Sequence, residues 1–130
     1  MKTWFRSQRG ASAIEMAIYT PVMFFVIFLT VQFALHYHGG QVAHAAAREG
    51  ARIARQSGGS DLAAAEARAT TYAAEVGGDQ LTEVEVSVVN IDGTHVRVEV
   101  CGRAKEIIKN ITPRVCRHAE GPIEEFRPDL

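Results

Sequence analysis

One uncharged run of twenty residues, Met16–Leu35, constrains the fold of this chain more than any other feature. The run consists of apolar residues apart from one tyrosine, two threonines, one proline and one glutamine. An α-helix rises ~1.5 Å per residue, so a helix of this length is ~30 Å long, which matches the hydrocarbon thickness of a bilayer. The sequence therefore predicts a single membrane-spanning helix near the N-terminus.

The charged residues on either side of the run indicate how such a helix would be oriented. Residues 1–10 contain Lys2, Arg6 and Arg9 and no acid, whereas the rest of the chain contains 11 basic and 15 acidic residues. Basic residues favour the cytoplasmic side, so we expect the N-terminus inside and everything after Leu35 outside. The acidic excess of the outer part argues against nucleic-acid binding, which requires concentrated positive charge.

An ordinary secretory signal peptide is the alternative explanation of this N-terminus. The apolar region of a signal peptide is usually shorter than Met16–Leu35, and a small-residue cleavage site should follow it. Here a His-Tyr-His triplet, residues 36–38, follows instead. We therefore expect a basic leader peptide at residues 1–10, a transmembrane helix at 11–38 and an extracytoplasmic α+β domain at 39–130.

A proline lies within the predicted transmembrane helix. Pro21 lacks an N–H and crowds the carbonyl of Ala17, so one hydrogen bond of the helix is lost. A backbone group that is freed inside lipid must be satisfied locally, and the Thr20 hydroxyl is placed to help. The sequence leaves open whether Pro21 acts as a hinge or is a tolerated proline with no special role.

Beyond the membrane segment the pattern predicts a helix at about residues 41–56, after a weak point at Gly39-Gly40. Small residues recur along it at intervals of four, namely Ala46, Gly50 and Ala54. Such a stripe allows close helix packing. Two interpretations remain open, because the stripe could contact a helix of another subunit or pack within its own domain.

A second, amphipathic helix is predicted at about residues 61–76. Ser60 or Asp61 can cap its start, and the glycine pair at 77–78 can end it. The helix should bury one face against the rest of the domain, because its apolar residues step by three and four. These residues are Leu62, Ala65, Ala69, Tyr72 and Val76.

From Thr82 the apolar period changes to two, which predicts a β-hairpin at about residues 82–101. Asp92-Gly93 supplies the turn, since glycine accepts the positive φ that a tight hairpin requires. The valine face should cover the second helix. Residues 105–111 suit a short helix or a crossing loop, and 115–119 could add a third strand. The predicted fold is thus a pilin-like α+β protein, with a small antiparallel sheet of two or three strands.

Two cysteines, Cys101 and Cys116, both fall in the predicted outer domain. Disulfides persist outside the cytoplasm, and a small domain gains from a cross-link. In the chain-entropy model, a loop of this length contributes ~3 kcal/mol. We therefore predict a Cys101–Cys116 disulfide, with two unrelated thiols as the alternative.

Gly10 and Glu15 form the candidate processing site. A membrane-embedded peptidase needs a small residue before the scissile bond, and cleavage after Gly10 would make Ala11 the first residue and Glu15 the fifth. A carboxylate at the edge of the hydrocarbon requires a partner. The α-amine of Ala11 on an adjacent subunit could supply it and so fix the register between subunits. Alternatively, Glu15 only marks the boundary of the span.

The N-terminal part of the chain resembles the TadE-like family of minor pseudopilins, which belong to the tight-adherence (Flp-type) branch of type IV pilus machinery. The resemblance covers roughly residues 8–55 and rests on the runs Arg9-Gly10-Ala11-Ser12-Ala13-Ile14-Glu15-Met16-Ala17 and Ala45-Ala46-Ala47-Arg48-Glu49-Gly50-Ala51-Arg52, with Pro21 between them. Ile14 and Met16 depart mildly from the family, which often has Val and Phe there. The cysteine pair is not part of the family pattern.

The resemblance implies a single-pass protein of a bacterial or archaeal cytoplasmic membrane, with its N-terminus inside. It implies cleavage after Gly10 by a prepilin peptidase. It also implies contacts with pilin and other pseudopilin subunits and with the pilus assembly platform. We accordingly predict a structural subunit for pilus assembly and adhesion. The alternative function is an unprocessed, membrane-tethered adaptor, whose outer domain binds an envelope protein or a surface ligand.

We expect no enzymatic activity, cofactor or small-molecule substrate. Motifs of phosphate-binding loops, nucleophile elbows, zinc proteases and CxxC redox sites do not occur in the sequence. His36, His38 and His44 do not predict a metal site, because residues two apart point to opposite sides of a helix and no cysteine or clustered carboxylate completes a ligand set.

Overall fold

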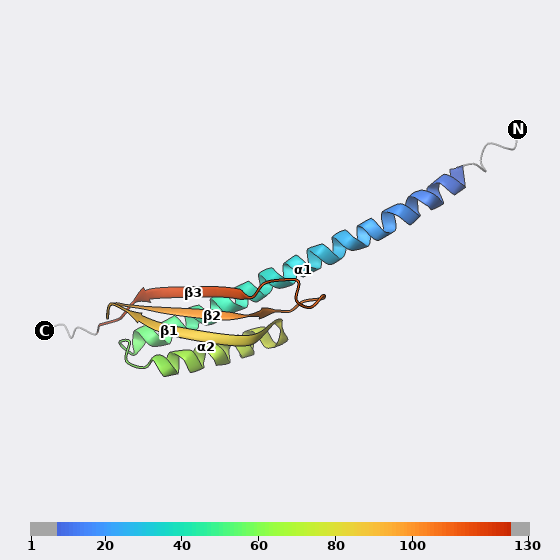
Figure 1. The fold of residues 1–130 in the computed structure, drawn as a ribbon. Helices are drawn as coiled ribbons and strands as arrows, with labels where there is room; N and C mark the ends of the chain where they lie inside the picture. Colours follow the sequence, from blue (N-terminus) through green and yellow to red (C-terminus); the bar gives the residue numbers. More distant parts are fainter. Residues whose placement is uncertain (1–7, 126–130) are drawn as a thin grey trace, which may run out of the picture. The chain divides into compact units, whose positions relative to one another are not determined.

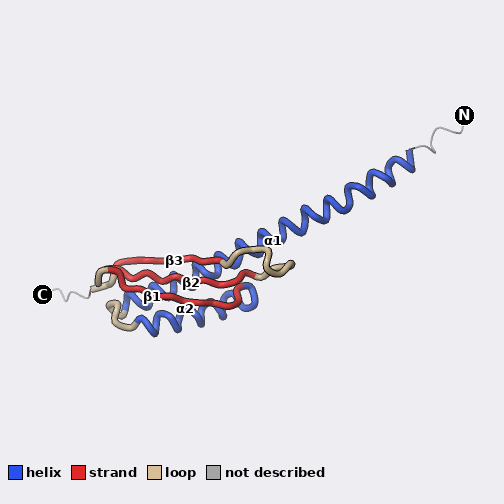
Figure 2. Tube along the Cα trace, viewed as in Figure 1, coloured by secondary structure: helices blue, strands red, loops and turns tan. Residues whose placement is uncertain are grey.

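The computed structural model describes residues 8–125. These residues divide into two compact units, 8–34 and 35–125. Lys2 and Arg6 of the predicted leader lie outside the described residues. In chain order the elements are α1 (Gln8–Gln56), α2 (Leu62–Gly77), the 3₁₀ turn η1 (Gly78–Gln80), β1 (Leu81–Ile91), β2 (His95–Ala104) and β3 (Val115–Pro122) (Figures 1 and 2).

The first unit consists of the N-terminal part of α1. Within the described residues, α1 is the one helix that is long and apolar enough to cross a membrane. The helix includes Pro21. The Thr20 hydroxyl donates a hydrogen bond to the carbonyl of Met16 at 2.6 Å. Our expectation that Thr20 would serve the carbonyl freed by Pro21 was therefore wrong, because that carbonyl belongs to Ala17.

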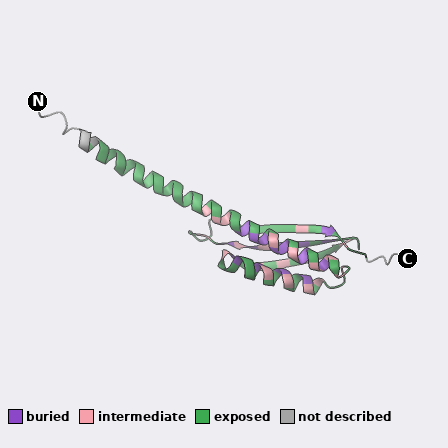
Figure 3. Cartoon of the chain, turned by 180° about the vertical axis from the view of Figure 1, so that it is seen from behind, coloured by how far each residue is buried: buried purple, intermediate pink, exposed green. Residues whose placement is uncertain are grey.

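The second unit is a three-stranded antiparallel sheet of order β1-β2-β3 with helices on one face. Figures 1 and 3 show α2 and the last part of α1 against the same face of the sheet. The centre of the core is the inward face of β2, where Val96, Val98 and Val100 are fully buried. Small side chains of both helices cover it, so the backbones approach closely. These are Ala43, Ala46, Ala47, Ala54, Ala65, Ala69 and Ala73, all fully buried.

The predicted fold class is confirmed: a long apolar N-terminal helix, a second helix and a small antiparallel sheet, here with three strands. Gly39 and Gly40 lie within α1 and do not interrupt it. A methyl group on Gly39 would lie 2.6 Å from Cβ of Ala104. The glycine pair therefore allows helix and sheet to touch.

The ends of α2 follow local sequence signals. Asp61 is the N-cap, and its carboxylate accepts a hydrogen bond from the Ala64 N–H at 2.9 Å. Gly78, at a positive φ of 53°, ends the helix. The buried residues of α2 step by four and are Ala65, Ala69, Ala73 and Gly77. The prediction that Val76 belongs to the buried face was wrong, since this side chain is 52% exposed.

The hairpin turn adopts the backbone that its sequence predicts. Asp92 and Gly93 have positive φ values of 54° and 69°, and the Thr94 N–H donates to the Ile91 carbonyl at 3.1 Å. Residues 105–111, which the sequence left open as a short helix or a crossing loop, belong to a loop of residues 105–114 between β2 and β3.

Candidate functional site

The residues of the predicted processing site lie on the exposed start of α1. Gly10 is exposed, and a methyl group added to it would meet nothing within 4 Å. Glu15 is exposed too, and within the described part of the chain it makes no hydrogen bond or ion pair. The side chain of Ala11 lies outside the described residues. Gly10 and Glu15 are thus accessible to other molecules. Cleavage after Gly10 stays a prediction.

A continuous apolar surface follows Glu15 along α1. The large apolar side chains from Met16 to Phe33 are all exposed, and Phe25 and Phe33 expose 67% and 72% of their surface. Water-exposed apolar surface of this extent is unusual for a soluble monomer and indicates contact with lipid or with other helices. Pro21 lies within this surface.

The stripe of small residues lies in the second unit, where it contacts the chain itself. Ala46 and Ala54 are fully buried. A methyl group on Gly50 would lie 2.9 Å from Cβ of Ala69 and 3.2 Å from a methyl of Val98. The sequence left two interpretations open for the stripe, contact with another subunit or packing within its own domain. These contacts show that the stripe packs within its own domain.

A charged network joins the two helices beside this stripe. Glu49 of α1 pairs with Arg52 at 2.8 Å and with Arg68 of α2 at 3.2 Å. The hydrogen bond from Arg52 is the main cause that lowers the pKa of Glu49 to about 2; partial burial opposes the shift, and Arg68 adds to it. Arg68 also lies over the ring of Tyr72, 5.3 Å from its centre. The network stabilises the contact of α1 with α2 on the surface of the domain.

Sequence reasoning missed this network. The spacing of Glu49 and Arg52 is a signal of a helical ion pair, since residues three apart are neighbours on a helix. Arg68 is 19 residues from Glu49 in the chain, so only the tertiary fold brings it there.

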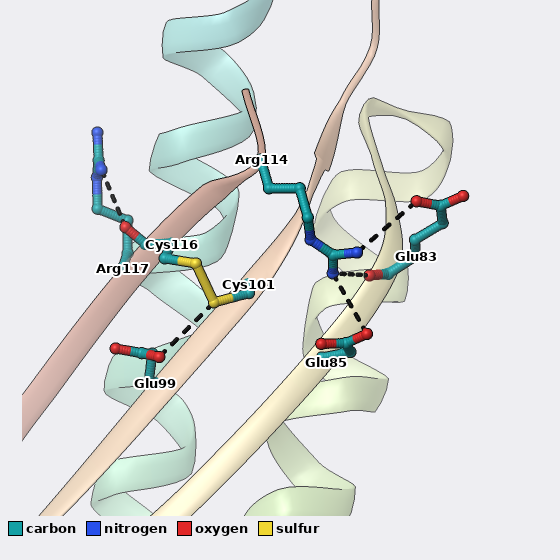
Figure 4. The surroundings of a disulfide bond; sticks show 7 residues. All are labelled: Glu83, Glu85, Glu99, Cys101, Arg114, Cys116 and Arg117. Atoms are coloured by element: carbon teal, nitrogen blue, oxygen red, sulfur yellow. Dashed lines mark hydrogen bonds and ion pairs between the residues drawn. A yellow bond between two sulfur atoms is a disulfide. The ribbon is translucent and has the colours of Figure 1, made fainter. Parts of the chain in front are cut away.

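The predicted disulfide is present and lies on the outer face of the sheet, away from the helices (Figure 4). Cys101 and Cys116 are directly opposed in the register of β2 and β3, with Cα atoms 4.1 Å apart. Within the described residues, one group could bring three metal-ligand atoms together, the two sulfurs and Glu99. The sulfurs are bonded to each other, so they are not thiolate ligands.

The outer face around the disulfide is charged. Arg114, just before β3, lies 3.6 Å from the carboxylate of Glu85 and donates a hydrogen bond to the Glu83 carbonyl at 3.0 Å (Figure 4). Arg97 of β2 pairs with Glu120 of β3 at 2.8 Å. The first contact joins the end of the loop before β3 to β1, and the second joins β2 to β3.

Comparison with known proteins identifies one similarity. The family model of TadE-like proteins matches residues 10–52. No curated protein and no solved structure matches the chain. The matched segment contains Gly10, Glu15 and the exposed apolar surface, and it continues through Glu49 to Arg52. Over residues 10–52 the chain is therefore similar to TadE-like proteins, and this is the resemblance that the sequence indicated.

Proposed function

We propose that the chain is a minor pseudopilin-like structural subunit required for the assembly of a tight-adherence type IV pilus. The observation that carries the proposal is the exposed apolar surface of α1, which begins directly after Glu15 within the TadE-like segment. A surface of this kind needs lipid before assembly and helices of other subunits after it. The chain acts by association rather than by catalysis.

In this proposal a prepilin peptidase removes residues 1–10 and leaves Ala11 as the first residue. Glu15 then lies near the N-terminus of the mature helix. There its carboxylate can pair with the α-amine of an adjacent subunit, which sets the register of the two helices. An ionised group at the edge of the hydrocarbon gains most from such a partner, because water is scarce there.

The second unit faces the outer side of the cytoplasmic membrane and contacts pilin or pseudopilin subunits of the assembly machinery. Its disulfide is consistent with this location, since disulfides persist in oxidising compartments. Within this unit, the network of Glu49, Arg52 and Arg68 holds α2 against the last part of α1, so that subunit contacts are made by a defined surface.

Two measurements test the proposal. The intact mass of the membrane-extracted protein should correspond to a chain that begins at Ala11. Deletion of the gene should abolish surface pili, and the full chain should restore them. Pili that form normally without this chain would contradict the assembly role. A chain that retains residues 1–10 and is dispensable for pili would instead favour the membrane-tethered adaptor.

A further inference from the structure

The loop between β2 and β3, residues 105–114, gathers exposed apolar side chains at one place on the second unit. Ile107, Ile108 and Ile111 are 46%, 59% and 60% exposed. The other large apolar side chains that are exposed in the described part of this unit are isolated, each on a different element: Tyr37, Val76 and Val89. The three isoleucines therefore form a local apolar surface. The loop of residues 105–114 that carries them is here called the isoleucine loop.

The isoleucine loop is held in a defined conformation. The carboxylate of Glu106 accepts hydrogen bonds from the N–H of Asn110 at 2.7 Å and from the N–H of Thr112 at 3.1 Å, and it also binds the Thr112 hydroxyl. Arg103 of β2 donates to the side-chain oxygen of Asn110 at 3.4 Å. The exposure of the isoleucines is thus a property of a closed, internally bonded turn.

Both ends of the loop lie against the beginning of α1 within the second unit. A methyl group on Gly39 would lie 2.6 Å from Cβ of Ala104, the last residue of β2, and one on Gly40 would lie 3.5 Å from a methyl of Val115, the first residue of β3. Gly39 follows Leu35, the end of the uncharged run, by four residues, or ~6 Å along a helix. The loop therefore starts and ends beside the point at which α1 would leave the bilayer.

The charges of the loop complement a phospholipid surface. Residues 105–114 contain three basic residues, Lys105, Lys109 and Arg114, and one acid, Glu106. Lys105 pairs with Asp79 and Arg114 pairs with Glu83 and Glu85, whereas Lys109 is exposed. Apolar side chains flanked by basic ones suit the boundary between headgroups and acyl chains. The apolar side chains enter the acyl region, and the basic side chains bind the phosphates of the headgroups.

We propose that the isoleucine loop docks on the outer leaflet of the membrane, with Ile107, Ile108 and Ile111 at the acyl boundary and Lys109 at anionic headgroups. This inference rests on the membrane anchoring that is part of the proposed function. It gives the outer domain a second lipid contact beside its helix. Docking restricts the tilt of the domain before the subunit joins other subunits.

Tryptophan fluorescence tests the docking. The native tryptophan, Trp4, is first replaced by phenylalanine in the full chain. Single tryptophans are then introduced by Ile108→Trp in the loop, Phe28→Trp in the apolar run and Val89→Trp on β1. Val89 is the matched control, since it is an exposed apolar residue close to the hairpin turn, at the other end of the sheet. Each variant is reconstituted in vesicles of phosphatidylcholine and phosphatidylglycerol with brominated acyl chains.

We expect the emission of the Ile108→Trp variant to be blue-shifted and quenched several-fold more strongly by the bromolipid than that of Val89→Trp. Strong quenching at position 28 with equal, weak quenching at 108 and 89 would overturn loop docking but leave the anchor intact. The loop would then face another protein. Weak quenching at all three positions would overturn the anchor and the docking together. None of these readouts requires a pilus, so they are independent of the assembly role.

A second comparison tests the headgroup contact. Lys109→Glu should reduce the bromolipid quenching of the Ile108→Trp variant in vesicles that contain phosphatidylglycerol. It should have a much smaller effect in vesicles of phosphatidylcholine alone, because there is no net negative surface charge to attract the lysine. Equal effects in the two lipids would overturn the assignment of Lys109 to anionic headgroups.

Discussion

Gly50 of α1 lies directly against Ala69 of α2, and a methyl group on Gly50 would come within 2.9 Å of Cβ of Ala69. The same methyl would lie 3.2 Å from the carbonyl oxygen of Ala65. Glycine costs about 1 kcal/mol relative to alanine in a helix interior, so its use here indicates that close contact outweighs helix propensity. At this point the methyl group of Ala69 is the side chain of α2 that lies against the backbone of α1.

We therefore predict that Gly50→Ala destabilises the domain by about 1–2 kcal/mol, because overpacking a close contact costs more than the helix propensity gained. Thermal unfolding of the full chain in detergent, followed by circular dichroism, measures the change. Ala69→Gly in the same chain should recover part of the loss, since it removes the opposing methyl. A Gly50→Ala chain that is more stable than the wild type would contradict the contact.

The second prediction concerns the disulfide. Replacing both Cys101 and Cys116 by serine should lower the free energy of unfolding by about 3 kcal/mol, the value that the chain-entropy model gives for a loop of this length. Cys116 is exposed and Cys101 half-buried on the outer face, so the double substitution leaves no cavity in the core. Chemical denaturation with and without reductant measures the loss.

The wild-type chain in reductant should show the same loss, whereas the double-serine variant should be insensitive to reductant. A thiol count on the unreduced, denatured wild type should find no free thiol. Two free thiols, or a double variant as stable as the wild type, would show that the cross-link does not hold the strands.

The parts of the fold that the sequence predicted are those with local signals. An uncharged run of membrane length, an Asp61 cap and an Asp92-Gly93 turn each depend on neighbouring residues alone. The pairing of Cys101 with Cys116 was also predicted, because a small domain outside the cytoplasm gains from a disulfide between its two cysteines. These features needed no knowledge of how helices and sheet would meet.

The contacts between distant segments could not be predicted in the same way. The stripe of Ala46, Gly50 and Ala54 suits any close helix partner, and only the tertiary fold identifies Ala69 of the same chain as that partner. Gly39-Gly40 was interpreted by its low helix propensity, yet contact with Ala104 makes the missing side chains an advantage. The exposed loop at residues 105–114 has no hydrophobic periodicity from which its position next to α1 could be predicted.

Glu49 provides a prediction about pH. Its pKa of about 2 in the folded protein lies below the ordinary value of 4.5, mainly because Arg52 donates hydrogen bonds to it. The stabilisation is therefore fully present well above pH 4.5 and is lost as the pH falls from there toward 2. Between these two values the unfolded chain binds the proton more readily than the folded one. Its size at neutral pH should be only about 1 kcal/mol, because the two arginines are partly exposed and solvent screens the pair.

Comparison of the wild type with Glu49→Gln isolates this effect from that of other carboxylates. The wild type should be the more stable at pH 7, and the difference should shrink as the pH is lowered through 4 toward 2. Glu66→Gln is the matched control, since Glu66 is an exposed glutamate on α2. The stability of this variant should change with pH as that of the wild type does. A difference that stays constant with pH would contradict the role of the ionised carboxylate.

The last prediction concerns Glu15, the one acid near the apolar surface of α1. Within the described residues it has no partner in the isolated chain, so its proposed partner must come from another subunit, the α-amine of Ala11. Glu15→Ala should therefore abolish or strongly reduce piliation, while the amount of protein in the membrane fraction stays unchanged, because the apolar run that drives insertion is intact. Glu15→Gln should behave like Glu15→Ala, since it keeps the shape but removes the charge, and Glu15→Asp should retain part of the activity.

Pili counted by electron microscopy and the intact mass of the extracted chain separate assembly from processing. Normal piliation with Glu15→Gln would show that the charge does not set the register, and loss of the protein from the membrane would show that Glu15 acts in insertion instead.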